Sequence, residues 1–156
     1  MNLETITSCT GTVQTVMPSP SICGAYSVTL AAGEDSVCIH LTPQTYVVDC
    51  VLLRPGMHLT AFHTPDLLPS PQPSAYPAFL VAQSGVKEQV VLNYFDQTLT
   101  AQDDSLRLNI SSQTDIQTFN GQRFTCHPGN RVLLVFYSIT TRSLPPQTSP
   151  RRIIVL

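Results

Sequence analysis

Apolar and polar residues alternate along four short stretches of the chain, residues 26–31, 37–41, 57–62 and 106–110. A period of two places the apolar side chains of each stretch on one face, which predicts half-buried β-strands. The turn sequence Gly33-Glu34-Asp35 separates the first two stretches. These two stretches therefore predict a β-hairpin.

Two later runs, residues 132–137 and 153–156, are apolar throughout. Continuous apolar runs of this length are typical of strands that are covered on both faces. Apolar residues nowhere recur with helical spacing over a dozen positions, and five of the thirteen prolines lie between Pro65 and Pro77. Since proline interrupts the hydrogen bonds of a helix, we expect an all-β protein with little helix.

Three segments of the first half recur in the second half about 70 residues later, which suggests an internal duplication of a unit of about 75 residues. Each pair shares a turn or the strand beside it. The pairs are residues 41–45 with 110–114, 55–62 with 128–136, and 76–81 with 149–155. Chance similarity between Pro-Gly turns in a proline-rich chain is the alternative explanation.

Each repeat would hold five short strands, an arrangement that resembles the OB-fold barrel. We therefore expect two tandem OB-like five-stranded barrels, residues 1–84 and 85–156, with the second packed against the first. The strands of the second barrel are predicted at residues 89–95, 98–101, 106–110, 131–137 and 152–156. Asn120-Gly121 lies where this fold often carries a helix and is instead a hairpin-turn signal. A different closed barrel or a single two-sheet sandwich also fits the pattern.

Charged residues make up only 12% of the chain, and Ser, Thr and Gln supply most of its polarity. The N-terminus lacks a basic segment followed by an apolar run, and no stretch approaches the roughly 18 apolar residues of a membrane-spanning helix. The five cysteines form no Cys-x-x-Cys pair, and so we expect reduced, mostly buried thiols rather than a disulfide framework. This combination predicts a cytoplasmic protein that does not bind a membrane.

The net charge of -2 is unevenly distributed along the chain. From Arg107 onward, six arginines are opposed only by Asp115. Because the arginine guanidinium suits carboxylate and phosphate groups, this distribution is compatible with an anion-binding face in the second half. Arginines scattered over alternate strand faces explain the same distribution without a ligand.

Two groups of residues in the second half are the candidate ligand-binding sites. Single-stranded nucleic acid binds to barrels of this kind by stacking its bases on aromatic side chains beside basic ones, and tyrosines also cap barrel rims without any ligand. The residues of this type are Tyr94, Arg107, Arg131, Tyr137 and Arg142. The second group, Thr140-Thr141-Arg142-Ser143, offers hydroxyls and a guanidinium to a small anion or a peptide carboxylate.

Motifs specific to catalysis, metals or cofactors are not apparent. Cys126-His127 is the nearest Cys/His pair, but adjacent residues in an extended chain point to opposite faces. Cys38 and His40 share one strand face, and His58 and His63 lie on a strand that could neighbour it, without the second close pair that a zinc site needs. Glycine-rich phosphate loops are also missing. We therefore expect no catalytic residue, no metal and no cofactor.

Residues 140–150, together with Ile153-Ile154-Val155-Leu156, resemble the end of a small family of uncharacterised proteins from Gram-positive gut anaerobes. Thr45-Tyr46-Val47-Val48-Asp49 and Pro55-Gly56-Met57 are similar to the same family. These segments are spread over most of the chain and include no catalytic signature. The resemblance implies a whole-chain unit and implies neither an activity nor a functional residue.

We therefore expect a non-catalytic binding or protein-interaction module that binds an unknown protein, a small anionic ligand or single-stranded nucleic acid. The alternative is an enzyme whose active site lies between the two units, recognisable by titratable side chains with shifted pKa in a pocket. A purely structural subunit is the third class, recognisable by a large exposed apolar patch.

Overall fold

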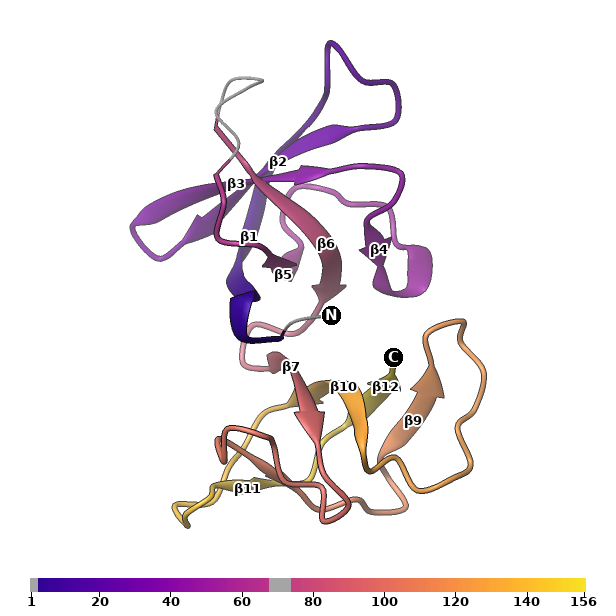
Figure 1. Cartoon of the computed structure of the whole chain (residues 1–156). Helices are drawn as coiled ribbons and strands as arrows, with labels where there is room; N and C mark the ends of the chain where they lie inside the picture. The colour runs from indigo at the N-terminus through magenta and orange to yellow at the C-terminus, as the bar shows by residue number, and fades with distance from the viewer. Residues whose placement is uncertain (1–2, 68–73) are drawn as a thin grey trace. The chain divides into compact units, whose positions relative to one another are not determined.

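The computed structural model describes residues 3–67 and 74–156, and the chain divides into two compact units, Met1–Ser84 and Gly85–Leu156 (Figure 1). Within the described residues, helix is limited to two 3-10 turns, η1 (Leu3–Thr5) and η2 (Val48–Cys50). The predicted all-β fold is therefore confirmed. None of the helical segments in this part of the chain has the length and apolar character that crossing a membrane requires.

The first unit is a closed, OB-like five-stranded barrel with one short additional strand. β1 pairs antiparallel with β2 and β5, β2 pairs with β3, and β5 pairs with β6. Parallel pairing of β3 with β6 closes the ring, and the short β4 also runs parallel to β6. The strands are β1 (Thr7–Pro18), β2 (Tyr26–Ala32), β3 (Asp35–Leu41), β4 (Tyr46–Val47), β5 (His58–His63) and β6 (Tyr76–Gln83).

Alternation along the strands builds the core of this barrel. The predicted hairpin is confirmed, because β2 pairs with β3 so that Val28 lies opposite Ile39 and both are fully buried. Gly11 lies on β1 where this strand pairs with β2 on one side and β5 on the other. A Cβ atom at this position would overlap the carbonyl oxygen of Ala31, and so only glycine allows this close approach.

The second unit forms a four-stranded sheet in the order β7-β10-β12-β9 and a two-stranded sheet of β8 and β11. The strands are β7 (Gln89–Phe95), β8 (Arg107–Leu108), β9 (Asp115–Thr118), β10 (Arg131–Tyr137), β11 (Gln147–Thr148) and β12 (Arg152–Val155). β10 is buried on both faces as predicted, since Val135 packs in the core cluster and Phe136, which points to the other face, is also 0% exposed.

Two predicted strands of this unit are shorter in the structure. Residues 98–101 contribute only isolated bridges, and the strand predicted at 106–110 is reduced to Arg107–Leu108. The cause lies in the turns before them. The Asp96 carboxylate accepts the N–H groups of Thr98 at 2.8 Å and Thr100 at 3.1 Å, which holds this segment in a turn rather than in an extended strand.

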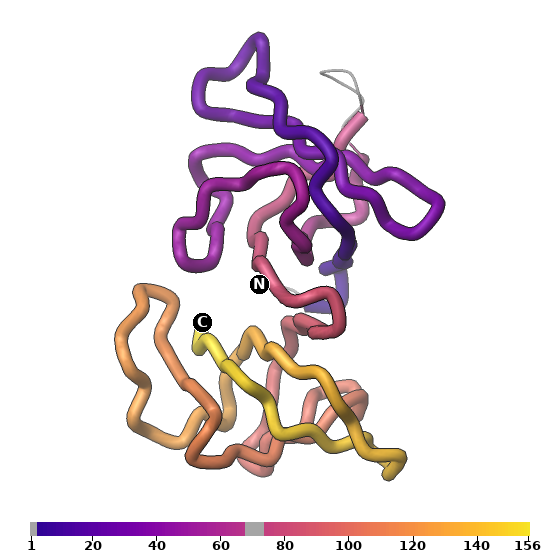
Figure 2. The backbone as a smooth tube through the Cα atoms, turned by 180° about the vertical axis from the view of Figure 1, so that it is seen from behind, coloured from indigo at the N-terminus to yellow at the C-terminus, as the bar shows by residue number. Residues whose placement is uncertain are grey.

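The two units share part of their strand pairing, although the antiparallel pairing of β2 with β1 and β3 has no full counterpart in the second unit. In the first unit β1 pairs with β5 and β5 pairs with β6, and in the second unit β7 pairs with β10 and β10 pairs with β12. The last strand of each unit, β6 in the first and the consecutive β11 and β12 in the second, is here called the fifth strand. In each unit the fifth strand also pairs in parallel with two earlier segments, which are β3 and β4 in the first unit and β8 and β9 in the second. Figure 2 shows this arrangement for the second unit, where the C-terminal strand runs beside the segment that contains β9.

A threonine fastens the fifth strand at the same place in both units. Thr45 Oγ1 donates to the carbonyl of Ala78 at 2.8 Å and accepts the N–H of Thr42 at 3.0 Å. Thr114 Oγ1 donates to the carbonyl of Pro150 at 2.9 Å and accepts the N–H of Ser111 at 3.3 Å. The two threonines occupy the last position of the repeated segments 41–45 and 110–114.

Replacing Thr114 with Val should lower the free energy of unfolding by about 1–2 kcal/mol, because the change removes a hydrogen-bond donor from a partly buried carbonyl. Urea denaturation followed by circular dichroism measures the effect. Ser112→Ala in the same turn is the control and should change the stability by less than about 0.5 kcal/mol. Equal losses in both variants would show that the Thr114 hydrogen bond does not hold the turn.

The five cysteines all lie within the described residues and are all unpaired. The expectation of mostly buried thiols is wrong, because Cys23, Cys50 and Cys126 are exposed and only Cys9 and Cys38 are partly buried. Burial raises the pKa of the Cys9 thiol to about 11, and burial also raises the pKa of Cys38. The exposed cysteines lie in loops and turns, whereas alternation places Cys9 toward the barrel core.

At pH 8, Cys9 should react with iodoacetamide about 100-fold more slowly in the folded protein than in urea, because burial raises its pKa from the ordinary 9.0 to about 11 and lowers its thiolate fraction by about that factor. Peptide mapping by mass spectrometry over a time course gives the rate at each position. The same reaction in urea is the control, in which all five cysteines should be modified at similar rates. Rapid native labelling of Cys9 would contradict its placement in the barrel.

Candidate functional site

The predicted base-stacking residues are not brought together by the fold. Tyr137 belongs to the core cluster, is 9% exposed and donates its hydroxyl to Gln89 at 2.9 Å. Tyr94 pairs opposite Val132 on the other face of the sheet. Since neighbouring positions of a strand point to opposite faces, Tyr94 and Tyr137 cannot form one stacking surface.

The arginines of the predicted group are dispersed as well. Arg131 donates to the carbonyls of His127 at 3.3 Å and Gly129 at 3.0 Å, and its guanidinium lies 5.2 Å from the ring centroid of Phe124. Arg107 is exposed on the short strand β8. Through these contacts Arg131 stabilises the loop that precedes it, and its side chain lines neither of the grooves described below.

The second predicted group lies in the loop between β10 and β11. Thr141, Arg142 and Ser143 are exposed there, and the hydroxyls of Thr141 and Ser143 are 2.5 Å apart. Thr141 also accepts the N–H of Gln147 at 3.0 Å. Of the eight residues in the two predicted groups, Thr140 and Thr141 line the groove described next, and the other six do not.

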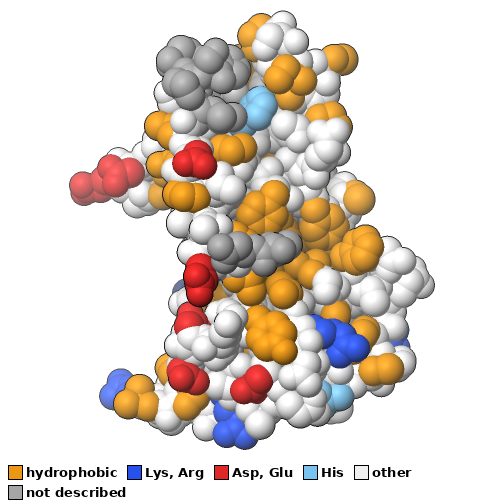
Figure 3. Space-filling view, viewed as in Figure 1, with side chains coloured by type: hydrophobic (Ala, Val, Ile, Leu, Met, Phe, Trp, Pro, Cys, Tyr) orange, Lys and Arg blue, Asp and Glu red, His pale blue; other side chains and the backbone are white. Residues whose placement is uncertain are grey.

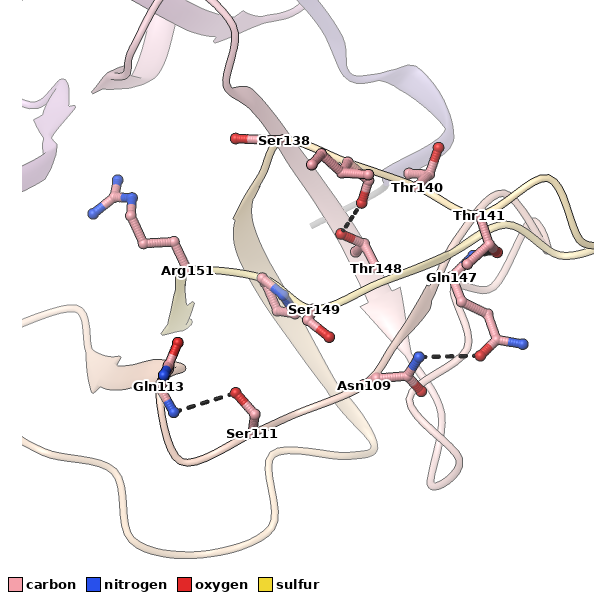
Figure 4. Close-up of a pocket in the computed structure, with 12 residues that line it drawn as sticks. Asn109, Ser111, Gln113, Ser138, Thr140, Thr141, Gln147, Thr148, Ser149 and Arg151 are labelled. Atoms are coloured by element: carbon pink, nitrogen blue, oxygen red, sulfur yellow. Dashed lines mark hydrogen bonds between the residues drawn. The ribbon is translucent and has the colours of Figure 1, made fainter.

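A groove of about 540 Å³ in the second unit collects side chains from three separate parts of the chain (Figure 4). It arises because the strand formed by β11 and β12 pairs first with β8 and then with β9, while the chain between β8 and β9 turns outward. The loop after β10 supplies the opposite wall. The lining residues are Asn109, Ser111, Gln113, Ser138, Ile139, Thr140, Thr141, Gln147, Thr148, Ser149, Pro150 and Arg151.

Hydrogen bonds within the lining fix some side chains and leave others open to a ligand. Asn109 donates to Gln147 Oε1 at 3.0 Å, and Thr148 Oγ1 donates to the carbonyl of Ile139 at 2.6 Å, both visible in Figure 4. Among the residues that the structure describes, the hydroxyls of Ser138, Thr140 and Ser149 have no hydrogen-bond partner. The groove therefore presents free hydroxyls on a framework held by amide and hydroxyl contacts.

The one charged side chain of the lining is already paired. Arg151 Nε and Nη2 lie 2.7 and 2.9 Å from the two carboxylate oxygens of Glu88, and this contact raises the pKa of Arg151. The Arg151 side chain points away from the Asn109–Gln147 pair (Figure 4). Across the described lining residues the groove is therefore electrically neutral, and a small anion would have to compete with Glu88. In the view of Figure 3, charged side chains cover a small part of the surface, and most of the acidic ones lie along its left edge.

The histidines and cysteines do not assemble a metal site. Among the described residues, no three side chains of the His, Cys, Asp and Glu types are grouped to hold a metal ion. The strand with His58 and His63 does not neighbour the strand with Cys38 and His40, because β6 lies between β5 and β3. His63 instead stacks on Tyr76 with the ring centroids 4.4 Å apart.

The Cys126-His127 pair is part of a turn. The imidazole Nδ1 of His127 accepts the N–H of Gly129 at 3.1 Å, and Cys126 is exposed. This contact turns the ring toward its own backbone.

Comparison of the chain with family models, with curated proteins and with solved structures gives no match. The resemblance to proteins of gut anaerobes remains a prediction from the residues alone.

Replacing Glu88 with Gln should lower the free energy of unfolding by about 0.5–1 kcal/mol at low ionic strength, because Arg151 is largely exposed and its ion pair is screened by water. Urea denaturation in low salt and in 1 M NaCl measures the effect, and the difference from the unmodified protein should shrink in high salt. Glu34→Gln, in the exposed turn between β2 and β3, is the matched control and should leave the stability unchanged. A salt-independent loss would mean that packing of Glu88, rather than its charge, stabilises the unit.

Proposed function

We propose that the protein is a binding module whose second unit holds an uncharged ligand, rich in hydroxyl or amide groups, in the polar groove. The observation that carries the proposal is the lining itself. The groove combines free hydroxyls from Ser138, Thr140 and Ser149 with carboxamides from Asn109 and Gln147. Hydroxyls and carboxamides both donate and accept hydrogen bonds, which matches a ligand that does the same.

Two features favour binding over a reaction. Among the described residues, the lining contains no carboxylate, imidazole or thiol, which are the groups that most often transfer protons or attack substrates. The groove is also framed by backbone pairing and side-chain hydrogen bonds, such as Thr148 to the Ile139 carbonyl, that hold its shape before a ligand arrives. Preorganised polar groups of this kind bind without the entropic cost of ordering a loop.

The charge of the groove separates this proposal from nucleic-acid binding. Each nucleotide carries a phosphate, and affinity for nucleic acid depends on unpaired Lys and Arg side chains. Arg151 is held by Glu88, and Arg142 is not among the lining residues. A neutral ligand fits this distribution better than a small anion or a single strand.

We also infer that the two units arose by duplication of one OB-like barrel. The shared part of the strand pairing and the equivalent hydrogen bonds of Thr45 and Thr114 support this origin. The three exposed cysteines are unpaired, which is typical of proteins in a reducing compartment. We therefore also propose that the protein is located in the cytoplasm.

Heteronuclear NMR titration of the full chain tests the proposal with neutral oligosaccharides, an uncharged peptide and a thymidine decanucleotide, each in 50 and 200 mM NaCl. We expect a neutral probe to shift the amide signals of residues 138–141 and 147–149, with the same Kd at both salt concentrations. Ser149→Tyr should abolish the shifts by filling the groove.

The control is Thr12→Tyr on an exposed position of β1, which should bind like the unmodified protein. Binding that survives Ser149→Tyr contradicts the proposal. Binding of the decanucleotide alone, weakening about tenfold or more as the salt rises, would assign the protein to nucleic acid instead. Failure of every neutral probe also overturns the proposal.

A further inference from the structure

A second groove of about 510 Å³ lies on the other side of the turn that borders the first. Ser111 and Gln113 line both grooves. The lining residues of the second groove are Ile110, Ser111, Ser112, Gln113, Thr114, Asp115, Ile116, Arg123, Phe124 and Thr125. The shared turn is therefore a ridge between two adjoining grooves, both within the second unit.

This ridge is held firmly by its own hydrogen bonds. The N–H of Gln113 donates to Ser111 Oγ at 3.2 Å, the N–H of Thr114 donates to the Ser111 carbonyl at 3.1 Å, and Thr114 Oγ1 fastens the turn to Pro150. Within the described residues, the side chains of Ser112 and Gln113 make no such contact. The ridge thus presents a free hydroxyl and a free carboxamide to whatever lies across it.

The second groove is lined by apolar side chains, a carboxylate and a guanidinium, in addition to hydroxyl groups like those of the first groove. Its one acid, Asp115, and its one base, Arg123, cancel in charge. Asp115 Oδ2 accepts a hydrogen bond from Gln117 at 2.9 Å and keeps its other oxygen for further contacts. Ile110 and Phe124 supply apolar surface beside these polar groups. Vicinal hydroxyls on a ring with apolar C–H faces match this mixture of groups.

We propose that the ligand of the module is a linear, uncharged oligosaccharide that lies across the Ser111–Gln113 ridge and occupies both grooves. This inference rests on the function proposed for the first groove and extends it to the second. A sugar chain presents hydroxyls along its whole length, as do the two grooves and the ridge between them.

An extended peptide fits this surface less well than a sugar chain. Peptides commonly bind by adding a strand to an open sheet edge. Here β9 pairs with β12 on one side, and Gln117 bridges to Arg123 on the other, so that the strand beside the second groove already has partners on both sides.

Isothermal titration calorimetry of the full chain with malto-, cello- and N-acetylchito-oligosaccharides of two to six units tests the inference. We expect at least one series to bind with an affinity that rises tenfold or more between two and six units. Thr125→Tyr, which fills the second groove, should reduce the affinity for the six-unit sugar to that for the shortest sugar that binds, without changing the latter. Thr12→Tyr is the control and should bind all lengths like the unmodified protein, and NMR spectra confirm that each variant is folded.

Two sets of results separate this inference from the proposed function. If affinity does not depend on length, or Thr125→Tyr has no effect on the six-unit sugar, the extended site is wrong while binding in the first groove stands, provided that Ser149→Tyr abolishes it. If only the uncharged peptide binds in the first groove, the sugar assignment is wrong. If Ser149→Tyr leaves all binding intact, both proposals fail together.

Discussion

The second unit depends on one strand that pairs in parallel with two different segments in succession. Residues 147–155 pair first with β8 and then with β9, and the backbone between the two pairings loses its regular partners. Pro150 lies in this gap, where its lack of an N–H leaves no donor unsatisfied. Its carbonyl accepts the hydroxyl of Thr114 at 2.9 Å. Together with the backbone hydrogen bonds from Asn109 to Thr148 and from Asp115 to Arg151, this contact ties the turn at residues 110–114 to the strand and so positions the residues that border both grooves.

The small fraction of charged residues determines the chemistry of the exposed surface. Only 12% of the residues are charged, and the exposed turns contain mainly Ser, Thr, Asn and Gln, which also line most of the groove. The Glu88–Arg151 pair neutralises the one charged side chain among the described residues that line the first groove. The groove is therefore neutral for two independent reasons, the composition of its loops and the pairing of its single arginine.

The parts of the fold that follow from local pattern could be predicted, whereas the groove could not. Alternation at residues 26–41 was enough for the hairpin, and the repeated segments 41–45 and 110–114 include the two threonines that fasten the fifth strands. The groove brings Asn109 and Gln147 together through the parallel pairing of β8 and β11, which no local pattern encodes. Tyr137 was misassigned as a stacking residue because a continuously apolar run does not show which positions face the core.

The weakness of individual neutral hydrogen bonds explains why a site of this kind needs length. Each such bond contributes only about 0.5–1.5 kcal/mol after water is displaced, and a groove without an ion pair or a deep apolar pocket has no stronger contact to offer. Useful affinity then requires many contacts made at once on a surface that is already ordered. The ridge from Ser111 to Gln113 meets this need. Its hydrogen bonds hold it in place, and its free side chains connect the two grooves into one continuous binding surface.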